Sequence, residues 1–150
     1  MLSIAHSATG AIIAAKVQNP FLYVPIVLAL HYLQDFIPHW DVGTGLTNGS
    51  RKRIHAFFLE WIDLVLSAGL IFALYPLSSS LDFSSLHPYI GAFIALVPDF
   101  LEFPINFLHW DIPLIKPINN FHHRFHHSTP NVFIGLLPQI ALILLITLLH

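Results

Sequence analysis

The stretch IHAFFLEWIDLVLSAGLIFALYP, residues 54–76, is the segment that best defines the fold. It exceeds the roughly 20 residues that an α-helix needs to cross a bilayer. Its ionisable side chains are His55, Glu60 and Asp63. Because a charge within a membrane is costly, Asp63 needs a partner, either a histidine in a buried pair or a metal ion. The sequence therefore predicts a membrane-spanning helix with a functional polar face.

The composition of the whole chain agrees with a membrane protein. Hydrophobic residues make up 55% of it and charged residues only 9%, whereas a soluble domain carries about 25% charged residues. This number of charged residues is too small to cover the surface of a soluble protein. The lipid bilayer is therefore the expected partner. The net charge of −2 gives no indication of nucleic-acid binding.

The chain has four further apolar segments besides 54–76, at 2–17, 19–38, 87–104 and 130–150. We therefore expect an all-α integral membrane bundle of about five hydrophobic helices, forming a single membrane domain over residues 1–150. The segments at 2–17 and 87–104 are short for a full crossing and are expected to be tilted, partly re-entrant or buried. Small residues in the first segment predict close helix packing: Ala8, Gly10, Ala11, Ala14 and Ala15.

If each segment crosses once, nearly all the ionisable residues gather at one membrane face. The opposite face holds only a few of them: Lys16, Asp82, His87 and His150. Five of the six Lys and Arg residues lie on the rich face. By the positive-inside rule, this face is expected to be cytoplasmic, with the N-terminus inside.

The segment HYLQDFIPHWD, residues 31–41, carries the most informative polar pattern. His31 and Asp35 are four positions apart and share a helix face, and His39 and Asp41 follow directly after the helix. The chain contains no cysteine, so a metal must be held by His, Asp or Glu, which suits zinc, iron or manganese. The pattern predicts ligands for one or two metal ions. The alternative is a polar helix end that faces water or lipid headgroups.

The segment FHHRFHHS, residues 121–128, precedes the last apolar run and supplies four histidines as candidate ligands: His122, His123, His126 and His127. Neutral imidazoles are good metal ligands, although four in one short loop cannot all bind the same ion. Arg124 between them is expected to hold a carboxylate or an anionic substrate group. The alternative is an interfacial loop of amphipathic residues.

Three further places complete the set of candidates. In LVPDFLEFP, Asp99 and Glu102 are three positions apart on one helix face. One of them is predicted to be a further metal ligand or the general base. The alternative is that both belong to a helix end that faces water. His6 is either a ligand or a simple polar cap. His109 and Asp111 are expected at the membrane interface.

The motifs AHSATGAIIA, HYLQDFIPHWD, LVPDFLE and HHRFHHS together resemble the membrane-bound metal-dependent hydrolase family, whose members are described as hydrolases of the inner membrane. The shared features are an early His followed by Gly, a Pro-Asp element at a helix end and a late His-Arg…His-Ser element. This sequence departs from the pattern where PHWD replaces a Pro-Asp element and where Arg124 is shifted by one position. The resemblance implies a location in a bacterial inner membrane and a metal site formed by His6, His31, Asp35, Asp99, His122 and His127.

A rival resemblance exists. HRFHH is also a His-x-x-His-His element, as found in the di-iron membrane fatty-acid hydroxylases and desaturases. Those enzymes carry several such boxes, whereas here Asp35 stands where a histidine is expected. A non-enzymatic metal-binding or partner-binding membrane protein is the third interpretation, and its metal would have every coordination position filled by protein.

We therefore expect a membrane-embedded hydrolase of an ester or phosphoester, acting on a lipid or lipid-linked substrate. Its cofactor is expected to be a divalent metal, zinc first, with iron or manganese as alternatives. The preferred ligands are His31, Asp35, His122, His126 and His127, with His6, His39, Asp41 and His123 as further candidates. Asp99, Glu102 and Arg124 are the expected catalytic residues.

Overall fold

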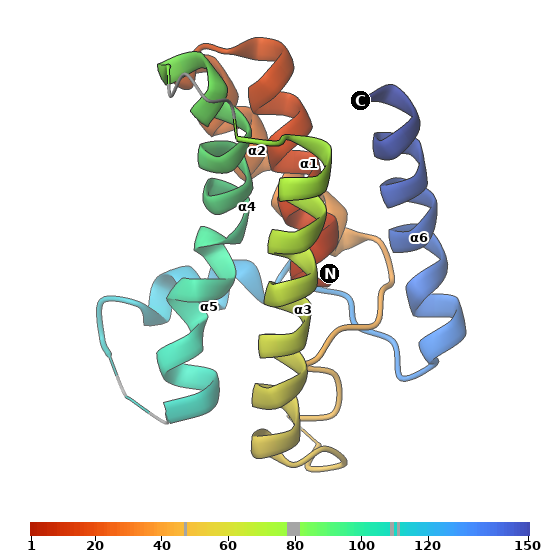
Figure 1. Cartoon of the computed structure of the whole chain (residues 1–150). Coiled ribbons are helices and arrows are strands. Elements are labelled where there is room, and N and C mark those ends of the chain that lie inside the picture. Colours follow the sequence, from red (N-terminus) through yellow and green to blue (C-terminus); the bar gives the residue numbers. More distant parts are fainter. Residues whose placement is uncertain (47, 78–81, 109, 111) are drawn as a thin grey trace.

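The computed structural model describes residues 1–46, 48–77, 82–108, 110 and 112–150, and these residues form helices and no strand. The all-α prediction is therefore confirmed for the described chain (Figure 1). The helices are α1 (Ser3–Val17), α2 (Pro20–Phe36), α3 (Arg53–Leu74), α4 (Phe83–Leu108), α5 (Lys116–His122) and α6 (Val132–Leu149).

Within the described part of the chain, three helices are long and apolar enough to cross a membrane, namely α3, α4 and α6. The expectation of about five such helices was therefore too high. The segments 2–17 and 19–38 form helices of only 15 and 17 residues, below the roughly 20 that a span requires. The segment 87–104 is longer than expected, because α4 continues through Pro98 and Pro104 to Leu108.

A tight turn joins α1 to α2. Gln18 ends α1 in the left-handed conformation, with a φ of 54°, and its N–H donates to the Ala14 carbonyl. Asn19 then begins α2, because its side-chain oxygen accepts the N–H of Phe21 at 3.0 Å. Pro20 fits at the first helical position, where no N–H is needed. The chain therefore reverses direction within a few residues.

Helix α1 lies inside the bundle and packs most extensively against α4. A Cβ atom built on Gly10 would lie 2.2 Å from the carbonyl oxygen of Gly91, and one built on Gly91 would lie 2.2 Å from that of Gly10. The two backbones therefore meet where neither helix has a side chain, as the small residues of α1 predicted. Because α1 is enclosed by other helices, it does not need the length of a helix that crosses lipid.

The N-terminus of α1 is capped by a side chain of α3. Asp63 accepts the backbone N–H of Ser3 at 2.5 Å and that of Ile4 at 3.2 Å. Glu60 accepts the hydroxyl of Ser3 at 2.8 Å. Asp63 therefore satisfies N–H groups that the first helical turn leaves free, and it lies in neither a His–Asp pair nor a metal-binding group of the described residues.

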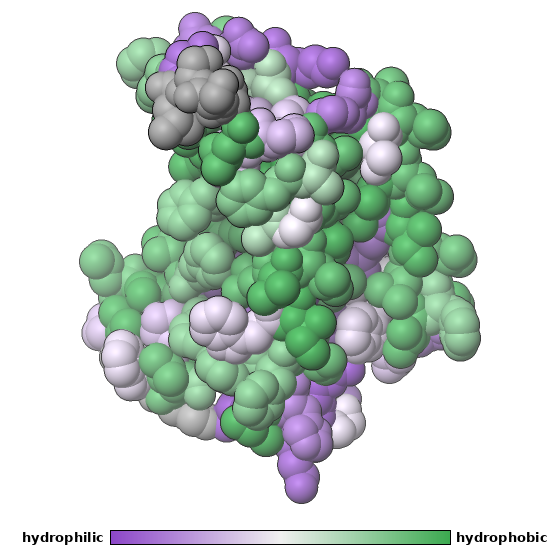
Figure 2. All heavy atoms as spheres, in the orientation of Figure 1, coloured by the Kyte–Doolittle hydropathy of each residue, from purple (hydrophilic) through white to green (hydrophobic). Residues whose placement is uncertain are grey.

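The surface is apolar over most of the height of the bundle. Figure 2 shows hydrophobic residues across the middle of this face and hydrophilic residues gathered at its two ends. Large side chains point outward from α3 and α6, among them Val65, Phe133 and Leu148, the last two more than four-fifths exposed. An apolar surface of this extent is unfavourable in water and fits contact with lipid, as an integral membrane protein requires.

Candidate metal centre

The polar residues of the core gather toward one end of the bundle. Figure 1 shows the end of α2, the end of α4, the whole of α5 and the start of α6 on the same side, away from the α1–α2 turn. The helices therefore alternate in direction as the sequence predicted, although among the described residues only α3, α4 and α6 are long and apolar enough to cross a membrane. Close to this end, residues nearly 90 positions apart meet.

Backbone hydrogen bonds fasten the loop before α6 to the end of α2. The N–H of His127 donates to the Asp35 carbonyl at 2.9 Å, and the N–H of His39 donates to the His127 carbonyl at 3.1 Å. The N–H of Thr129 donates to the carbonyl of His39 at 2.7 Å. This pairing, a single parallel β-bridge, brings the late histidines beside the motif at 31–41.

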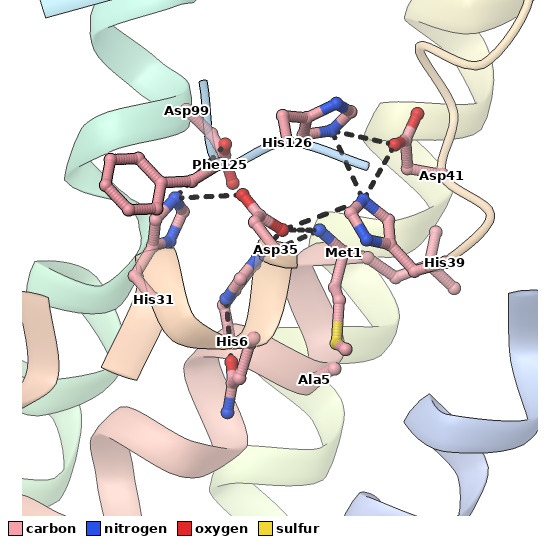
Figure 3. Close-up of polar contacts among 12 residues, drawn as sticks. Met1, Ala5, His6, His31, Asp35, His39, Asp41, Asp99, Phe125 and His126 are labelled. Atoms are coloured by element: carbon pink, nitrogen blue, oxygen red, sulfur yellow. Dashed lines mark hydrogen bonds and ion pairs between the residues drawn. The ribbon is translucent and has the colours of Figure 1, made fainter. Parts of the chain in front are cut away.

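One set of side chains, which we call the inner group, consists of His31, Asp35, Asp99 and His122. The Nε2 atom of His122 lies 2.7 Å from Asp35 Oδ2. His31 Nε2 lies 3.4 Å from that same oxygen and 3.4 Å from His122 Nε2. Asp99 Oδ1 is farther away, at 3.7 Å from His31 Nε2. Ligand atoms from α2, α4 and α5 thus converge on one small volume, and Figure 3 shows three of these side chains, His31, Asp35 and Asp99.

A second set, the outer group, consists of Asp35, His39 and His126. The Nε2 atoms of His39 and His126 are 3.2 Å apart, and Asp35 Oδ1 lies 3.6 Å from His39 Nε2. Asp41 adjoins this group, with Oδ2 at 3.1 Å from His39 Nε2 and 2.9 Å from His126 Nε2. Figure 3 shows these side chains pointing toward one another.

Backbone carbonyls fix the rings of His31 and His39. The Nδ1 atom of His31 lies 2.8 Å from the Ala95 carbonyl, and that of His39 lies 2.8 Å from the Ile37 carbonyl. A carbonyl only accepts, so each Nδ1 carries a proton, and Nε2 is left as the atom that holds either a second proton or a metal ion beside the carboxylates. Metal-binding histidines are typically oriented through their second nitrogen in this way.

His122 lies between two carboxylates. Its Nδ1 lies 3.0 Å from Glu102 Oε1, on the side of the ring away from Asp35, but the pair does not have the geometry of a hydrogen bond. Burial would lower the pKa of His122, but its contacts with Asp35 and Glu102 raise that pKa to about 10. Without a metal, this ring is therefore held as a cation between two carboxylates, which shows that the surroundings favour positive charge.

Asp41 shows the same electrostatic balance at the edge of the site. Its burial alone would raise the pKa of the carboxyl group, but hydrogen bonds with the two imidazoles of the outer group bring the pKa below its ordinary value. The carboxylate therefore stays ionised at neutral pH. Together with Asp35 it gives the outer group two anionic side chains to balance an ion.

His6 lies beside both groups without belonging to either. Its Nε2 is 3.1 Å from Asp35 Oδ1, its Nδ1 is 2.8 Å from Gln34 Oε1, and its ring stacks on His31 with centroids 4.0 Å apart. The terminal ammonium group of Met1 also forms an ion pair with Asp35. The structure therefore places His6 as a neighbour that fixes the position of Asp35.

Besides His6, Asp41 and Glu102, three exposed residues among those predicted lie outside both groups. Arg124 and His127 are exposed, and the Nδ1 of His127 faces a backbone carbonyl of its own loop. His123 is exposed as well and lines a cavity beside the site. His109 and Asp111 fall outside the described residues. Sequence reasoning missed Gln34, whose signal was a polar residue next to Asp35 within an apolar helix.

A cavity of about 330 Å³ adjoins the site. Its walls include members of both groups, Asp99 and His122 from the inner group and His126 from the outer, together with Asp41. No Lys or Arg belongs to its described lining. A bound molecule therefore reaches both groups at once, and the charged or titratable side chains that it meets are carboxylates and imidazoles. The Met1 ammonium group, which also lines the cavity, is ion-paired with Asp35.

Comparisons with protein-family models, with curated proteins and with solved structures found no match to this chain.

Proposed function

We propose that this chain is a membrane-embedded, metal-dependent hydrolase that acts on an ester or phosphoester of a lipid or lipid-linked substrate. The observation that carries the proposal is the arrangement of His31 and His39, whose Nδ1 atoms are bound to backbone carbonyls. Their Nε2 atoms point at buried carboxylates. A nitrogen and an anionic oxygen this close need a proton or a metal ion between them, and the fixed Nδ1 leaves Nε2 available to a metal ion.

The spacing of the inner group supports zinc as the first choice. Two ligand atoms, each about 2.1 Å from a tetrahedral zinc ion, lie roughly 3.4 Å from each other. In the inner group, His31 Nε2 lies 3.4 Å from both Asp35 Oδ2 and His122 Nε2. The third pair, Asp35 Oδ2 and His122 Nε2, is closer at 2.7 Å and would separate by about 0.7 Å around a bound zinc ion. The donor set of nitrogen and oxygen also suits iron or manganese.

Each residue of the inner group has a role in this proposal. His31, Asp35 and His122 would hold the ion, which lowers the pKa of water and polarises an ester oxygen. Asp99 lines the cavity with its side chain 31% exposed and is placed to take a proton from the attacking water. The water oxygen bonds to carbon or phosphorus, the bond to the leaving oxygen breaks, and the proton from Asp99 passes to that oxygen.

Two observations favour this function over the alternatives. Carboxylates make up half of the inner group, whereas the di-iron oxygenase pattern calls for boxes of histidine. A cavity opens beside the ligands, as a catalytic site with a free coordination position requires and a closed structural site does not. A metal-binding protein without activity is therefore the less favoured reading.

The first prediction concerns the metal. The protein, purified in detergent through a tag other than polyhistidine, should carry at least one equivalent of a divalent metal by mass spectrometry. Because the ion binds only the folded site, adding it at about 1,000 times its Kd should stabilise the protein by roughly 4 kcal/mol. A chelator should abolish hydrolysis of lipid esters or phosphoesters. Less than a tenth of an equivalent after metal supplementation would contradict the proposal.

The second prediction concerns orientation. We propose that the end of the bundle bearing the site faces the cytoplasm, in a bacterial inner membrane as the resemblance implies, because Arg51, Lys52 and Arg53 lie at the start of α3 there. Ser50 and Ser84 are both exposed, and each can be changed to cysteine in this cysteine-free chain. An impermeant thiol reagent applied from outside should label Ser84→Cys alone. Equal labelling of both variants from one side would contradict the alternating crossings.

A further inference from the structure

Asp35 is the residue that the inner and outer groups share. It is fully buried, and its two oxygens face different partners. Oδ2 lies 2.7 Å from His122 Nε2. Oδ1 forms an ion pair with the Met1 ammonium group, lies 3.1 Å from His6 Nε2 and is 3.6 Å from His39 Nε2, so an ion bound at Oδ1 would displace that ammonium group. His31 and His39 stand four positions before and after Asp35, so the two imidazoles approach the carboxylate from opposite sides.

Each group contains enough ligand atoms for an ion of its own. The inner group offers two imidazoles besides Asp35 Oδ2, with Asp99 nearby. The outer group offers His39 and His126 besides Asp35 Oδ1, with the Asp41 carboxylate within 3.1 Å of both imidazoles. A carboxylate with nitrogen ligands gathered separately at each oxygen is the arrangement of a bridging ligand.

We propose that the two groups form one dinuclear metal centre in which Asp35 is the bridging ligand, and that its substrate is a phosphoester. The inference rests on the proposed hydrolase function and extends it to the number of ions and the class of substrate. Two ions held together are characteristic of enzymes that carry out displacement at phosphorus, because one ion serves each of the attacking and leaving oxygens.

The cavity connects this centre to its substrate. Its walls include His122 from the inner group and His126 from the outer group, so one phosphoryl group can lie against both. Phosphate is usually bound by Arg or Lys, yet neither belongs to the described lining, which instead carries Glu60, Asp99 and Glu102. The Met1 ammonium group in this lining is already ion-paired with Asp35. Two divalent ions supply the positive charge that a phosphoester needs among these carboxylates.

The number of ions tests the first half of the proposal. The metal-depleted protein is loaded with Mn²⁺, freed of excess ion and analysed by mass spectrometry. We expect two Mn²⁺ per chain, falling to one in His126→Ala. The matched control is His127→Ala, whose exposed ring lies outside both groups and which should retain two. One ion in the unaltered protein would overturn the proposal.

Electron paramagnetic resonance supplies a readout that does not depend on activity. Two Mn²⁺ ions bridged by a carboxylate should give a magnetically coupled spectrum, and His126→Ala should give that of an isolated ion. The spectrum of the unaltered chain tests the bridge even where a variant does not fold. Two uncoupled ions would overturn the role of Asp35.

The substrate class is tested separately, with Mn²⁺-loaded protein in mixed micelles. Phosphate release from phosphatidic acid or from glycerol 3-phosphate supports a phosphoester, and the faster of the two shows whether the phosphate belongs to a lipid. Cleavage of p-nitrophenyl acetate alone would overturn the phosphoester while leaving the proposed hydrolase intact. No hydrolysis of any probe by a two-ion protein would overturn the hydrolase itself.

Discussion

Replacing Asp35 with alanine should remove metal from both groups and strongly destabilise the protein. Asp35 is the most connected side chain of the site, with the Nε2 atoms of His6, His31 and His122 within 3.4 Å of its oxygens. Removing one partner of a buried ion pair costs about 3–5 kcal/mol, because the other charge stays buried without compensation. We expect metal content below a tenth of the unaltered value, measured by mass spectrometry, together with a marked fall in melting temperature.

The matched variant Asp35→Asn distinguishes the effect of the side-chain shape at position 35 from the effect of its negative charge. Asparagine keeps the volume and one acceptor oxygen but removes the anionic charge that binds a metal ion. This variant should fold better than Asp35→Ala and still lose most of the metal. If Asp35→Ala keeps more than half of its metal, the centre does not depend on the shared carboxylate, and both groups must be redefined.

Replacing Gly91 with alanine should disrupt the crossing of α1 and α4. The new Cβ would lie 2.2 Å from the carbonyl oxygen of Gly10 and 2.4 Å from the Cβ of Ala14. A backbone oxygen cannot rotate away, so the helices must separate. Overpacking typically costs roughly 1–3 kcal/mol, and here we expect the upper part of that range. Unfolding in mixed micelles with increasing denaturing detergent measures the loss.

Gly69 provides the control, because a Cβ built there meets nothing within 4 Å. Alanine is favoured over glycine within a helix by up to about 1 kcal/mol. Gly69→Ala should therefore be neutral or slightly stabilising. Equal effects of the two substitutions would show that helix propensity and not the close crossing governs stability. Since α1 carries His6, Gly91→Ala should also lower metal affinity, and Gly69→Ala should not.

The sequence predicted the helical class and the span at 54–76 because length and hydropathy are local properties. It did not distinguish a helix that crosses lipid from one enclosed by other helices. Both are apolar, and only the contacts of α1 with α4 and α3 decide between them. The caps at Asp63 also join distant segments, so no local pattern reveals them.

For the candidate site, the sequence placed His31 and Asp35 together because their spacing is that of one helix face. It left open which late histidines accompany them. A helical turn at the end of α5, closed by the N–H of His126 on the carbonyl of His122 at 3.1 Å, turns His122 and His126 inward and leaves His123 and His127 outward. The meeting of His39 with His126 depends on the backbone pairing before α6, which no sequence period encodes.

The most direct measurement is the position of the bound metal by anomalous scattering at its absorption edge. Our account predicts density within about 2.0–2.2 Å of the Nε2 atoms of His31 and His122. A second maximum is expected across Asp35, at His39 and His126. Density located only at the exposed rings of His123 and His127, or no density in metal-loaded protein, would contradict it.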